Sequence, residues 1–505
     1  MNDIKIKLIT LFLLLISFIL IIYYLNKDSY ISNITVKEIK ANRTLNEELI
    51  DELKINGIPA IYDKITDMYF YTIPSKNNIK KYNLRIDTNK GYKYKINDQK
   101  TTEIKVDYEK PLNIIIYNDK YYYETTIQLT NLPLVKIDTE CVINREDCES
   151  AFEYIDGSSK VKTYSSKIHI RGATSLKLPK KSYKIDIYDN KYNNTKNILI
   201  DGFSNQDSFI LDGIYKDTSK IRNVLSTELW NSVSRDFLEV IVNYKFVELF
   251  INNEYKGLYV LTDPINRKKL NLKKSEDDDT SIVIKDSSWD SINSYDDLDI
   301  KSMEYAGNEI KYPNTNEYND KIWPKVLSKL STYYDGDTKY DVVKEVFNMN
   351  NYIDIVIFNA FINNVDNHLA KNNYFYMESI NDDEIFIQPW DMEFSFGLIY
   401  DSKPDLFSKK KLDDYDEVKT PFKFDLELNK LIIKRYWVLR KTVLTKEYFD
   451  KLLDEYLNEL NKGAAKRDSN LWYEYDIKEE IKEIRNWIYK RLDFFDEYIR
   501  GLEDE

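Results

Sequence analysis

Hydrophobic and polar positions alternate in several short stretches of the first quarter of the chain, and this pattern is typical of β-strands. The clearest stretches are residues 67–73, 112–117 and 121–127, and polar turns separate them. Strands at this spacing predict a small β-sandwich over residues 28–131. No side chain in this region suggests catalysis, so we interpret it as a spacer or recognition module.

From about residue 132 onward, strand-like and helix-like patterns alternate along the chain. Residues 167–172 and 182–188 show the period of two that predicts strands. Such a mixture predicts an α+β domain over residues 132–505, larger than the module before it.

Two further patterns in this domain predict a helix and a hairpin. Residues 219–230 have helical spacing, with Thr218 or Ser219 as the predicted N-cap. Residues 246–251 and 255–261 are apolar runs joined by Asn-Asn-Glu, which predicts a β-hairpin with a tight turn.

The remaining patterns predict one loop and two buried helices. Residues 275–320 are mostly polar and acidic, and we interpret them as an insertion loop. Residues 352–362 form a long apolar run that predicts a buried helix. Near the C-terminus, apolar residues recur at helical spacing, which predicts a helix packed against the domain. They are Ile477, Ile481, Ile484, Ile488, Leu492, Phe495 and Ile499.

The N-terminus contains an uncharged apolar stretch at residues 8–25. At 1.5 Å per residue it covers about 27 Å, close to the thickness of a bilayer core. Lys5 and Lys7 precede it, which favours a cytoplasmic N-terminus. No small-residue cleavage site follows, so we favour a signal-anchor transmembrane helix within residues 1–27 over a cleaved signal peptide. This predicts a single-pass membrane protein whose C-terminal domain is extracytoplasmic.

Composition changes this picture in two respects. The net charge of −12 argues against nucleic acid as the main partner, because phosphate backbones require a basic surface. The chain has two cysteines, Cys141 and Cys148. In an exported domain a disulfide between them is favoured over two free thiols.

Two acidic loops contain the candidate catalytic chemistry. Asp366 follows the predicted helix at 352–362 and precedes Asn372 by six residues, and Asp391 follows a predicted strand at 384–387. One carboxylate could accept a proton from an acceptor hydroxyl, while an amide and a second carboxylate hold Mg²⁺ on ATP phosphates. Taken singly, each loop is more simply a structural turn. Taken together, they predict metal-assisted phosphoryl transfer.

A basic loop joins the strands predicted at 167–172 and 182–188. It begins at Arg171 and contains Lys180 and Lys181, and the charges of these lysines could neutralise phosphates. By itself, a basic strand connection is more often a solvated sheet edge.

The order of these motifs resembles the CotH family, the spore-coat-protein-H type of atypical protein kinase. The segments that carry the resemblance are residues 171–183, 215–223, 248–259, 366–373 and 389–397. The resemblance implies a two-lobed, protein-kinase-like fold. It also implies transfer of the γ-phosphoryl group of ATP to Ser/Thr hydroxyls of proteins, for example coat or surface proteins, with Mg²⁺ or Mn²⁺ as cofactor.

The resemblance further implies roles for the acidic loops. Asp366 corresponds to the catalytic base and Asp391 to the principal metal ligand. Asn372 or Asn373 corresponds to a second ligand, and the spacing leaves the choice between them open. Glu393 stands where the family more usually has Asp, so metal geometry could differ here.

The basic loop and three other residues also match family positions. Lys180 or Lys181 corresponds to a phosphate-contacting lysine, and Arg171 to a residue that shapes the loop. Three further residues could orient the site: Asp217, Arg222 and Glu248. We expect the first two of these to form an ion pair.

Two other functions compete with a protein kinase. A surface-displayed, invasin-like or spore-coat binding protein could keep the same fold without catalysis. Alternatively, ATP chemistry could act on a non-protein acceptor such as polyphosphate or a cell-wall polymer. The sequence does not distinguish them by itself, nor does it name the substrate.

Overall fold

The computed structural model describes residues 35–503 with a set of gaps. These gaps are residues 48–51, 74–78, 89–90, 158–160, 173, 191, 201, 204, 235–239, 277–278, 287–301, 306, 335–338, 365, 367–370, 383, 400–408 and 411–424. The chain forms two compact units. The N-terminal unit comprises residues 1–134, 155–162 and 253–255, and the C-terminal unit comprises the rest up to residue 505.

The N-terminal unit is built mainly from strands, and the three predicted there are confirmed. Its largest sheet has the order β4 (Ile61–Asp63), β5 (Met68–Thr72), β11 (Tyr121–Thr130), β10 (Leu112–Tyr117) and β8 (Lys93–Ile96), with β1 (Thr44–Leu45) beside β11. The smaller sheets are β3 (Ile58–Pro59), β2 (Lys54–Ile55) and β7 (Ile86–Asp87), and β6 (Lys81–Asn83) with β9 (Glu103–Lys105). Buried side chains from all three sheets share one hydrophobic cluster, for example Ile55, Ile104 and Ile114.

A short helix, α2 (Val36–Asn42), precedes these strands and is capped by Thr35 and Glu38. The predicted membrane anchor at residues 8–25 lies outside the described residues. In the described part of the chain, no helix combines the length and apolar character that crossing a bilayer would require.

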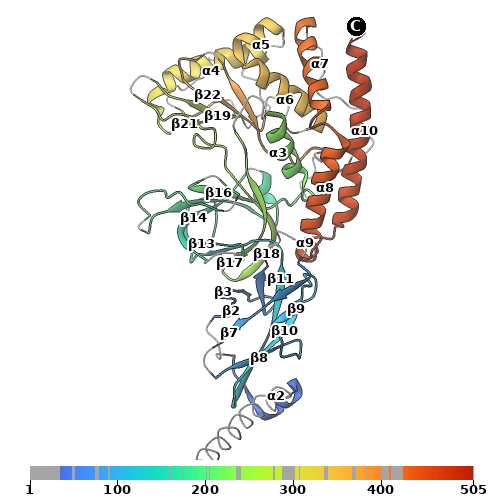
Figure 1. Ribbon diagram of the computed structural model, residues 1–505. Coiled ribbons are helices and arrows are strands. Elements are labelled where there is room, and N and C mark those ends of the chain that lie inside the picture. Colours follow the sequence, from blue (N-terminus) through green and yellow to red (C-terminus); the bar gives the residue numbers. More distant parts are fainter. Residues whose placement is uncertain are drawn as a thin grey trace, which may run out of the picture. The chain divides into compact units, whose positions relative to one another are not determined.

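The C-terminal unit contains a closed barrel, drawn in green tones in Figure 1. Its strands follow one another as β12 (Leu134–Asp138), β13 (Cys148–Ile155), β14 (Thr163–Arg171), β15 (Ser182–Tyr188), β16 (Ser208–Asp212), β18 (Glu254–Thr262) and β17 (Tyr244–Ile251). Alternate residues of each strand point inward and form the barrel core, including Ile168, Ile185 and Phe209. The strands predicted at 167–172 and 182–188 are therefore confirmed as antiparallel neighbours.

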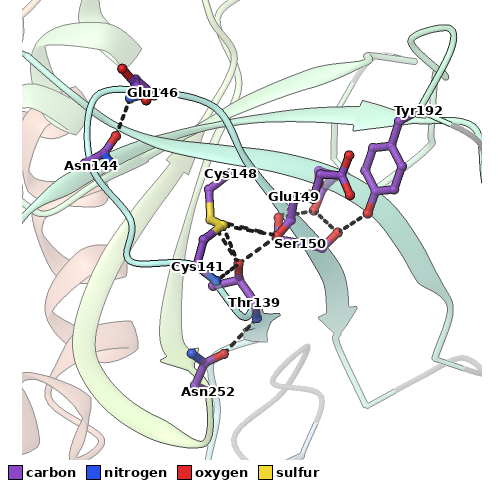
Figure 2. Close-up of a disulfide and its surroundings, with 10 residues drawn as sticks. Thr139, Cys141, Asn144, Glu146, Cys148, Glu149, Ser150, Tyr192 and Asn252 are labelled. Atoms are coloured by element: carbon purple, nitrogen blue, oxygen red, sulfur yellow. Dashed lines mark hydrogen bonds between the residues drawn. A yellow bond between two sulfur atoms is a disulfide. The ribbon is translucent and has the colours of Figure 1, made fainter.

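The predicted disulfide is confirmed. Cys141 and Cys148 are joined across the connection between β12 and β13, as Figure 2 shows. Thr139 supports it, because its hydroxyl donates to the Glu149 carbonyl at 2.7 Å and accepts from the backbone of Cys141 at 3.3 Å. The disulfide therefore fixes a loop that already has local hydrogen bonds.

The predicted hairpin is also confirmed, as β17 and β18. Asn252 and Asn253 at its turn both have positive φ, 51° and 58°. Asparagine tolerates this conformation, and two such residues match the twist of the flanking strands.

A second sheet corrects one prediction. Its order is β20 (Glu304–Tyr305), β21 (Asn308–Tyr312), β19 (Ile282–Asp286), β22 (Asn373–Met377) and β23 (Phe386–Pro389). The interpretation of 275–320 as an insertion loop is therefore wrong, because β19 is the central strand of this sheet. Its apolar part, Ile282 to Ile284, is too short to stand out among polar neighbours, and tertiary burial makes it a strand.

Helices complete the C-terminal unit (Figure 1). They are α3 (Arg222–Val233), α4 (Asn319–Tyr334), α5 (Tyr340–Val346), α6 (Met349–Ile362), α7 (Leu426–Arg440), α8 (Lys446–Leu460), α9 (Ala464–Leu471) and α10 (Ile477–Glu503). The predicted buried helix is α6, and the predicted C-terminal stripe is buried along α10. The N-cap prediction for α3 is wrong. Asp217 accepts the backbone N–H of Arg222 at 2.8 Å, and neither Thr218 nor Ser219 is the cap.

Candidate active site

A cavity of about 450 Å³ lies within the C-terminal unit. Its lining comes from barrel strands β14, β16 and β18, from helix α3, and from strands β19 and β23 of the second sheet. The volume falls within the usual range for small-molecule and cofactor sites. The cavity can therefore hold a ligand of nucleotide size.

One part of the lining is apolar and aromatic. Ile210 of β16, Val260 of β18, Val224 and Trp230 of α3, and Val242 all contribute to it. Trp230 is fixed by its indole N–H, which donates to Gln388 Oε1 at 3.1 Å. Such a surface suits a flat aromatic ring rather than a charged group.

The two acidic loops meet at one edge of the second sheet. Along the chain they lie at opposite ends of the β22–β23 strand pair, but the strands are antiparallel, so Asn373 pairs with Pro389. The backbone N–H of Trp390 donates to the Asn372 carbonyl at 2.9 Å and joins the loops directly. Asp366 and Asp391 consequently line the same cavity.

Asp366 is held by two neighbours from its own loop. Lys371 Nζ donates to one carboxylate oxygen at 2.5 Å, and Asn372 Nδ2 donates to the other at 3.0 Å. Asn373 faces elsewhere, because its fully buried side chain donates to the Lys371 carbonyl at 3.1 Å and does not line the cavity. The geometry therefore distinguishes the two asparagines, and Asn372 is the one at the site.

Asp391 and Glu393 lie among other acids. Both line the cavity, where Asp391 is exposed to solvent and Glu393 half-buried. Although Asp391 is exposed in part, the protein packed around its carboxylate desolvates it, and Asp212 and Asp366 add negative charge that Arg171 only partly offsets, so the pKa of Asp391 is raised. Burial, with Asp391 and Asp212 nearby, also raises the pKa of Glu393 well above its ordinary value. Crowded acids of this kind favour a bound cation.

Three residues around the cavity have a left-handed backbone conformation. Asp391 has φ 58°, Asn372 has φ 57° and the β-branched Ile214 has φ 41°. Aspartate and asparagine tolerate this region, whereas for Ile214 it is strained, and such strain concentrates at functional sites. Ile214 lies two residues after Asp212, the last residue of β16, and the Asp212 carboxylate also lines the cavity.

The predicted phosphate lysines have protein partners. Lys180 lines the cavity, but its side chain is fully buried and donates to Asp468 Oδ1 at 2.6 Å. Lys181 does not line the cavity, and its ammonium group donates to the carbonyls of Leu176 and Leu178 in its own loop. Arg171 does line the cavity, with its guanidinium 5.5 Å from the centre of the Trp390 ring.

The supporting residues lie outside the lining. The predicted Asp217–Arg222 ion pair is confirmed at 2.6 Å, and both side chains are buried. Burial alone would raise the pKa of Asp217, but Arg222 and the hydroxyl of Ser219 hold it below its ordinary value. Glu248 on β17 pairs with Arg467 of α9 at 2.8 Å. These residues support the framework around the site rather than the site itself.

Sequence reasoning missed five residues that structure places at or behind the cavity. They are Asp212, Asn223, Lys216, Lys285 and Asp468. Asn223 connects the two sides of the cavity, since it donates to Asp212 at 3.2 Å and accepts the backbone N–H of Met392 at 3.2 Å. The signal for Asp212 was its place at the end of a short apolar strand. Asp468 gave no such signal.

The acidic residues fit a divalent metal in chemistry, although their ligand atoms do not form a tight cluster. Carboxylate and amide oxygens are the donors that Mg²⁺ prefers. Within the described ranges, the three-residue group whose ligand atoms lie within 4.8 Å of one another is Asp147, His169 and Asp186. None of those three lines the cavity. Within the same described residues, Asp391 and Glu393 line the cavity without forming such a group with a third acid.

Comparison with protein families finds a match for the larger part of the chain. A family model described as CotH kinase protein matches residues 168–495, well over half of the chain. This range includes the basic loop, both acidic loops and α9. No curated protein matches the chain.

Proposed function

Since the chain belongs to the family of CotH kinase proteins, we propose that it transfers the γ-phosphoryl group of ATP to serine or threonine hydroxyls of a protein substrate. The observation that carries this proposal is the convergence of Asp366 and Asp391 on one cavity. Their loops are joined by the hydrogen bond from Trp390 to Asn372. A catalytic base and a metal ligand need this shared space.

Asp366 is the proposed general base. Its carboxylate would accept the proton of the acceptor hydroxyl as that oxygen attacks the γ-phosphorus. Lys371 and Asn372 fix both of its oxygens, so they are positioning residues. Asp366 is also half-buried at the cavity, which leaves it open to an incoming hydroxyl.

Asp391, Glu393 and Asn372 are the proposed holders of Mg²⁺ or Mn²⁺. When bound, the metal would neutralise charge on the phosphate oxygens. The raised pKa values of Asp391 and Glu393, caused first by burial and then by neighbouring acids, support a cation there. The apolar surface around Val242 and Val260 is the proposed site of the adenine ring.

The proposed location is outside the cytoplasm, with the domain attached to a membrane at the cell surface or associated with a spore. Support comes from the apolar stretch at residues 8–25 and from the disulfide between Cys141 and Cys148. Protease treatment of intact cells would remove the domain if this is correct. Protection of the whole chain until lysis would contradict it.

Phosphoryl transfer is tested with the purified full chain, γ-labelled ATP, and Mg²⁺ or Mn²⁺. The expected result is label in serine or threonine of the chain itself or of casein as a generic acceptor. Asp366→Asn and Asp391→Asn should both lose this label while circular dichroism stays unchanged.

Two outcomes would replace the proposal by its alternatives. If the wild-type chain neither binds ATP with metal nor transfers label, the non-catalytic surface-protein alternative stands. If label appears only in a non-protein product, the acceptor is polyphosphate or a cell-wall polymer. A variant series in which Asp391→Asn retains full transfer would contradict the role given to this carboxylate.

A further inference from the structure

Two lysines that line the cavity have different surroundings. Lys180 is enclosed by protein, since its ammonium donates to Asp468 Oδ1 at 2.6 Å and to the Leu258 carbonyl at 2.5 Å. It also lies 4.7 Å from the centre of the Tyr259 ring. The donors of Lys180 are therefore committed to the protein, and a phosphate would have to displace Asp468.

Asp468 is in turn fully engaged. One of its oxygens also accepts the backbone N–H of Leu258 at 2.9 Å, and the other accepts Tyr475 at 3.1 Å and lies 3.5 Å from Lys220. Burial alone would raise the pKa of Asp468, but Lys180 and Lys220 hold it below its ordinary value. Such a closed network stabilises the protein and leaves no donor for a ligand.

Lys285 on β19 is different. It lines the cavity and is half-buried, and within the described part of the chain its ammonium forms no hydrogen bond and no ion pair. Burial lowers the pKa of Lys285, and the nearby cations Arg171 and Lys311 lower it further. The negative charge of Asp391 raises the pKa of Lys285 and so partly offsets this lowering, although no hydrogen bond joins the two side chains.

Like charges in a partly desolvated place are unfavourable unless an opposite charge joins them. Arg171 and Lys285 together present cationic groups to the cavity beside Asp391, where a metal would be held. A triphosphate supplies the opposite charge. Its oxygens can accept hydrogen bonds from Arg171 and Lys285, and they can also contact a metal held at Asp391.

We propose that Lys285, together with Arg171, binds the phosphates of the nucleotide, and that Lys180 is a structural lysine held by Asp468. This inference rests on the proposed function, because it assigns the phosphate contacts within the same ATP site. It keeps Arg171 of the basic loop and moves the lysine contact from Lys180 or Lys181 to the central strand of the second sheet.

The test measures binding of Mg·ATP and of adenosine to the full chain by calorimetry. Lys285→Met should weaken ATP binding about 10- to 100-fold, the usual loss of a charge-assisted contact, and leave adenosine binding unchanged. Lys285→Arg should restore most of the ATP affinity. The matched control is Lys311→Met on β21. Lys311 lies outside the cavity lining and pairs with Glu309. The ATP affinity of this variant should stay within about twofold of the wild-type value.

Lys180→Met provides the opposite comparison. It should lower the melting temperature while the folded protein retains ATP affinity within about threefold, as expected where no ligand contact is lost. The inference is overturned if Lys285→Met binds ATP like the wild type, if it loses adenosine and ATP equally, or if Lys180→Met loses more ATP affinity than Lys285→Met. If Lys180→Met does not fold, the Lys285 and Lys311 variants still decide. Failure of the wild type to bind ATP at all would instead contradict the proposed function.

Discussion

Charged side chains on α9 and charged side chains at the β19–β23 edge of the cavity have opposite surroundings. On α9, Asp468 meets Lys180 and Arg467 meets Glu248, with each acid fully buried beside a cation. At the cavity edge, Asp391 and Glu393 have acidic neighbours as well as the cations Arg171 and Lys285 beside Asp391, and the pKa values of both acids are raised. The same residue types therefore occur in one unit in two arrangements.

The comparison shows how to separate framework charges from ligand charges. A buried acid that is paired with a protein cation has a lowered pKa despite its burial. Asp468 is an example, because Lys180 and Lys220 lower its pKa by more than burial raises it. A half-buried acid crowded by acids has a raised pKa, as desolvation and then the charges of Asp391 and Asp212 bring about for Glu393. The first arrangement is complete without a ligand, whereas the second is completed by a cation from outside.

The largest expected effect is on turnover at the cavity edge. Asp366→Asn removes the proposed base but keeps the shape, so kcat should fall about 10²- to 10⁴-fold with little change in ATP affinity. Steady-state phosphorylation kinetics together with ATP calorimetry measure both quantities. Glu248→Gln is the framework control, and a loss of kcat per folded molecule there as large as for Asp366→Asn would break the comparison.

The next effect is on stability at α9. Asp468→Asn leaves Lys180 and Lys220 buried without their acid, which should lower the free energy of unfolding by about 3–5 kcal/mol. Urea denaturation followed by tryptophan fluorescence measures it. Asp391→Asn should act in the opposite direction and raise the midpoint, because it removes a crowded charge. Destabilisation by both substitutions would show that the two regions do not differ.

Binding of Mg·ATP should stabilise the protein through the acids at the cavity, Asp391 and Glu393, and not through the ion pairs of α9. Mg·ATP at 100 times its Kd should stabilise the wild-type chain by about 2.7 kcal/mol, seen as a higher melting temperature. Asp391→Asn with Glu393→Gln should lose most of this gain, while Glu248→Gln should keep it. If Mg·ATP raises the melting temperature of the double variant as much as that of Glu248→Gln, the cation is not held by Asp391 and Glu393.

The smallest effect is a pH dependence of opposite sign in the two regions. Because the folded pKa values of Asp391 and Glu393 are raised by burial and by neighbouring acids, the folded state binds more protons than the unfolded state. Their contribution to stability therefore falls as pH rises from the ordinary carboxyl pKa of about 4. Asp468, whose pKa is lowered, contributes stability that is lost as pH falls.

Melting temperatures from pH 8 to pH 4 measure this difference. The double variant Asp391→Asn, Glu393→Gln should exceed the wild type most at pH 8, and the gap should shrink toward pH 4 as the wild-type acids take up protons. A gap that is constant over this range would show that the two acids are not perturbed.

Much of the fold was predictable from the sequence by itself, because the relevant signals are local. The buried helix α6, the Asn-Asn hairpin and the C-terminal stripe are set by apolar spacing and by turn residues within a few positions. The ordered motifs also predicted the family and brought Asp366 and Asp391 forward as a pair. Periodicity missed β19, since a run of three apolar residues carries too little pattern.

Only the tertiary structure decided which charged residue has which partner. Asn372 and Asn373 are adjacent and alike in sequence, yet Asn372, which precedes β22 and has a positive φ, lines the cavity, whereas Asn373, the first residue of β22, is fully buried and does not. Lys180 and its partner Asp468 are 288 positions apart in the sequence. Lys285 reaches the cavity lining because its strand, β19, is paired with β21 and β22 in the second sheet. Electrostatic roles depend on distance in space, and no local pattern encodes a distance that the folded chain alone creates.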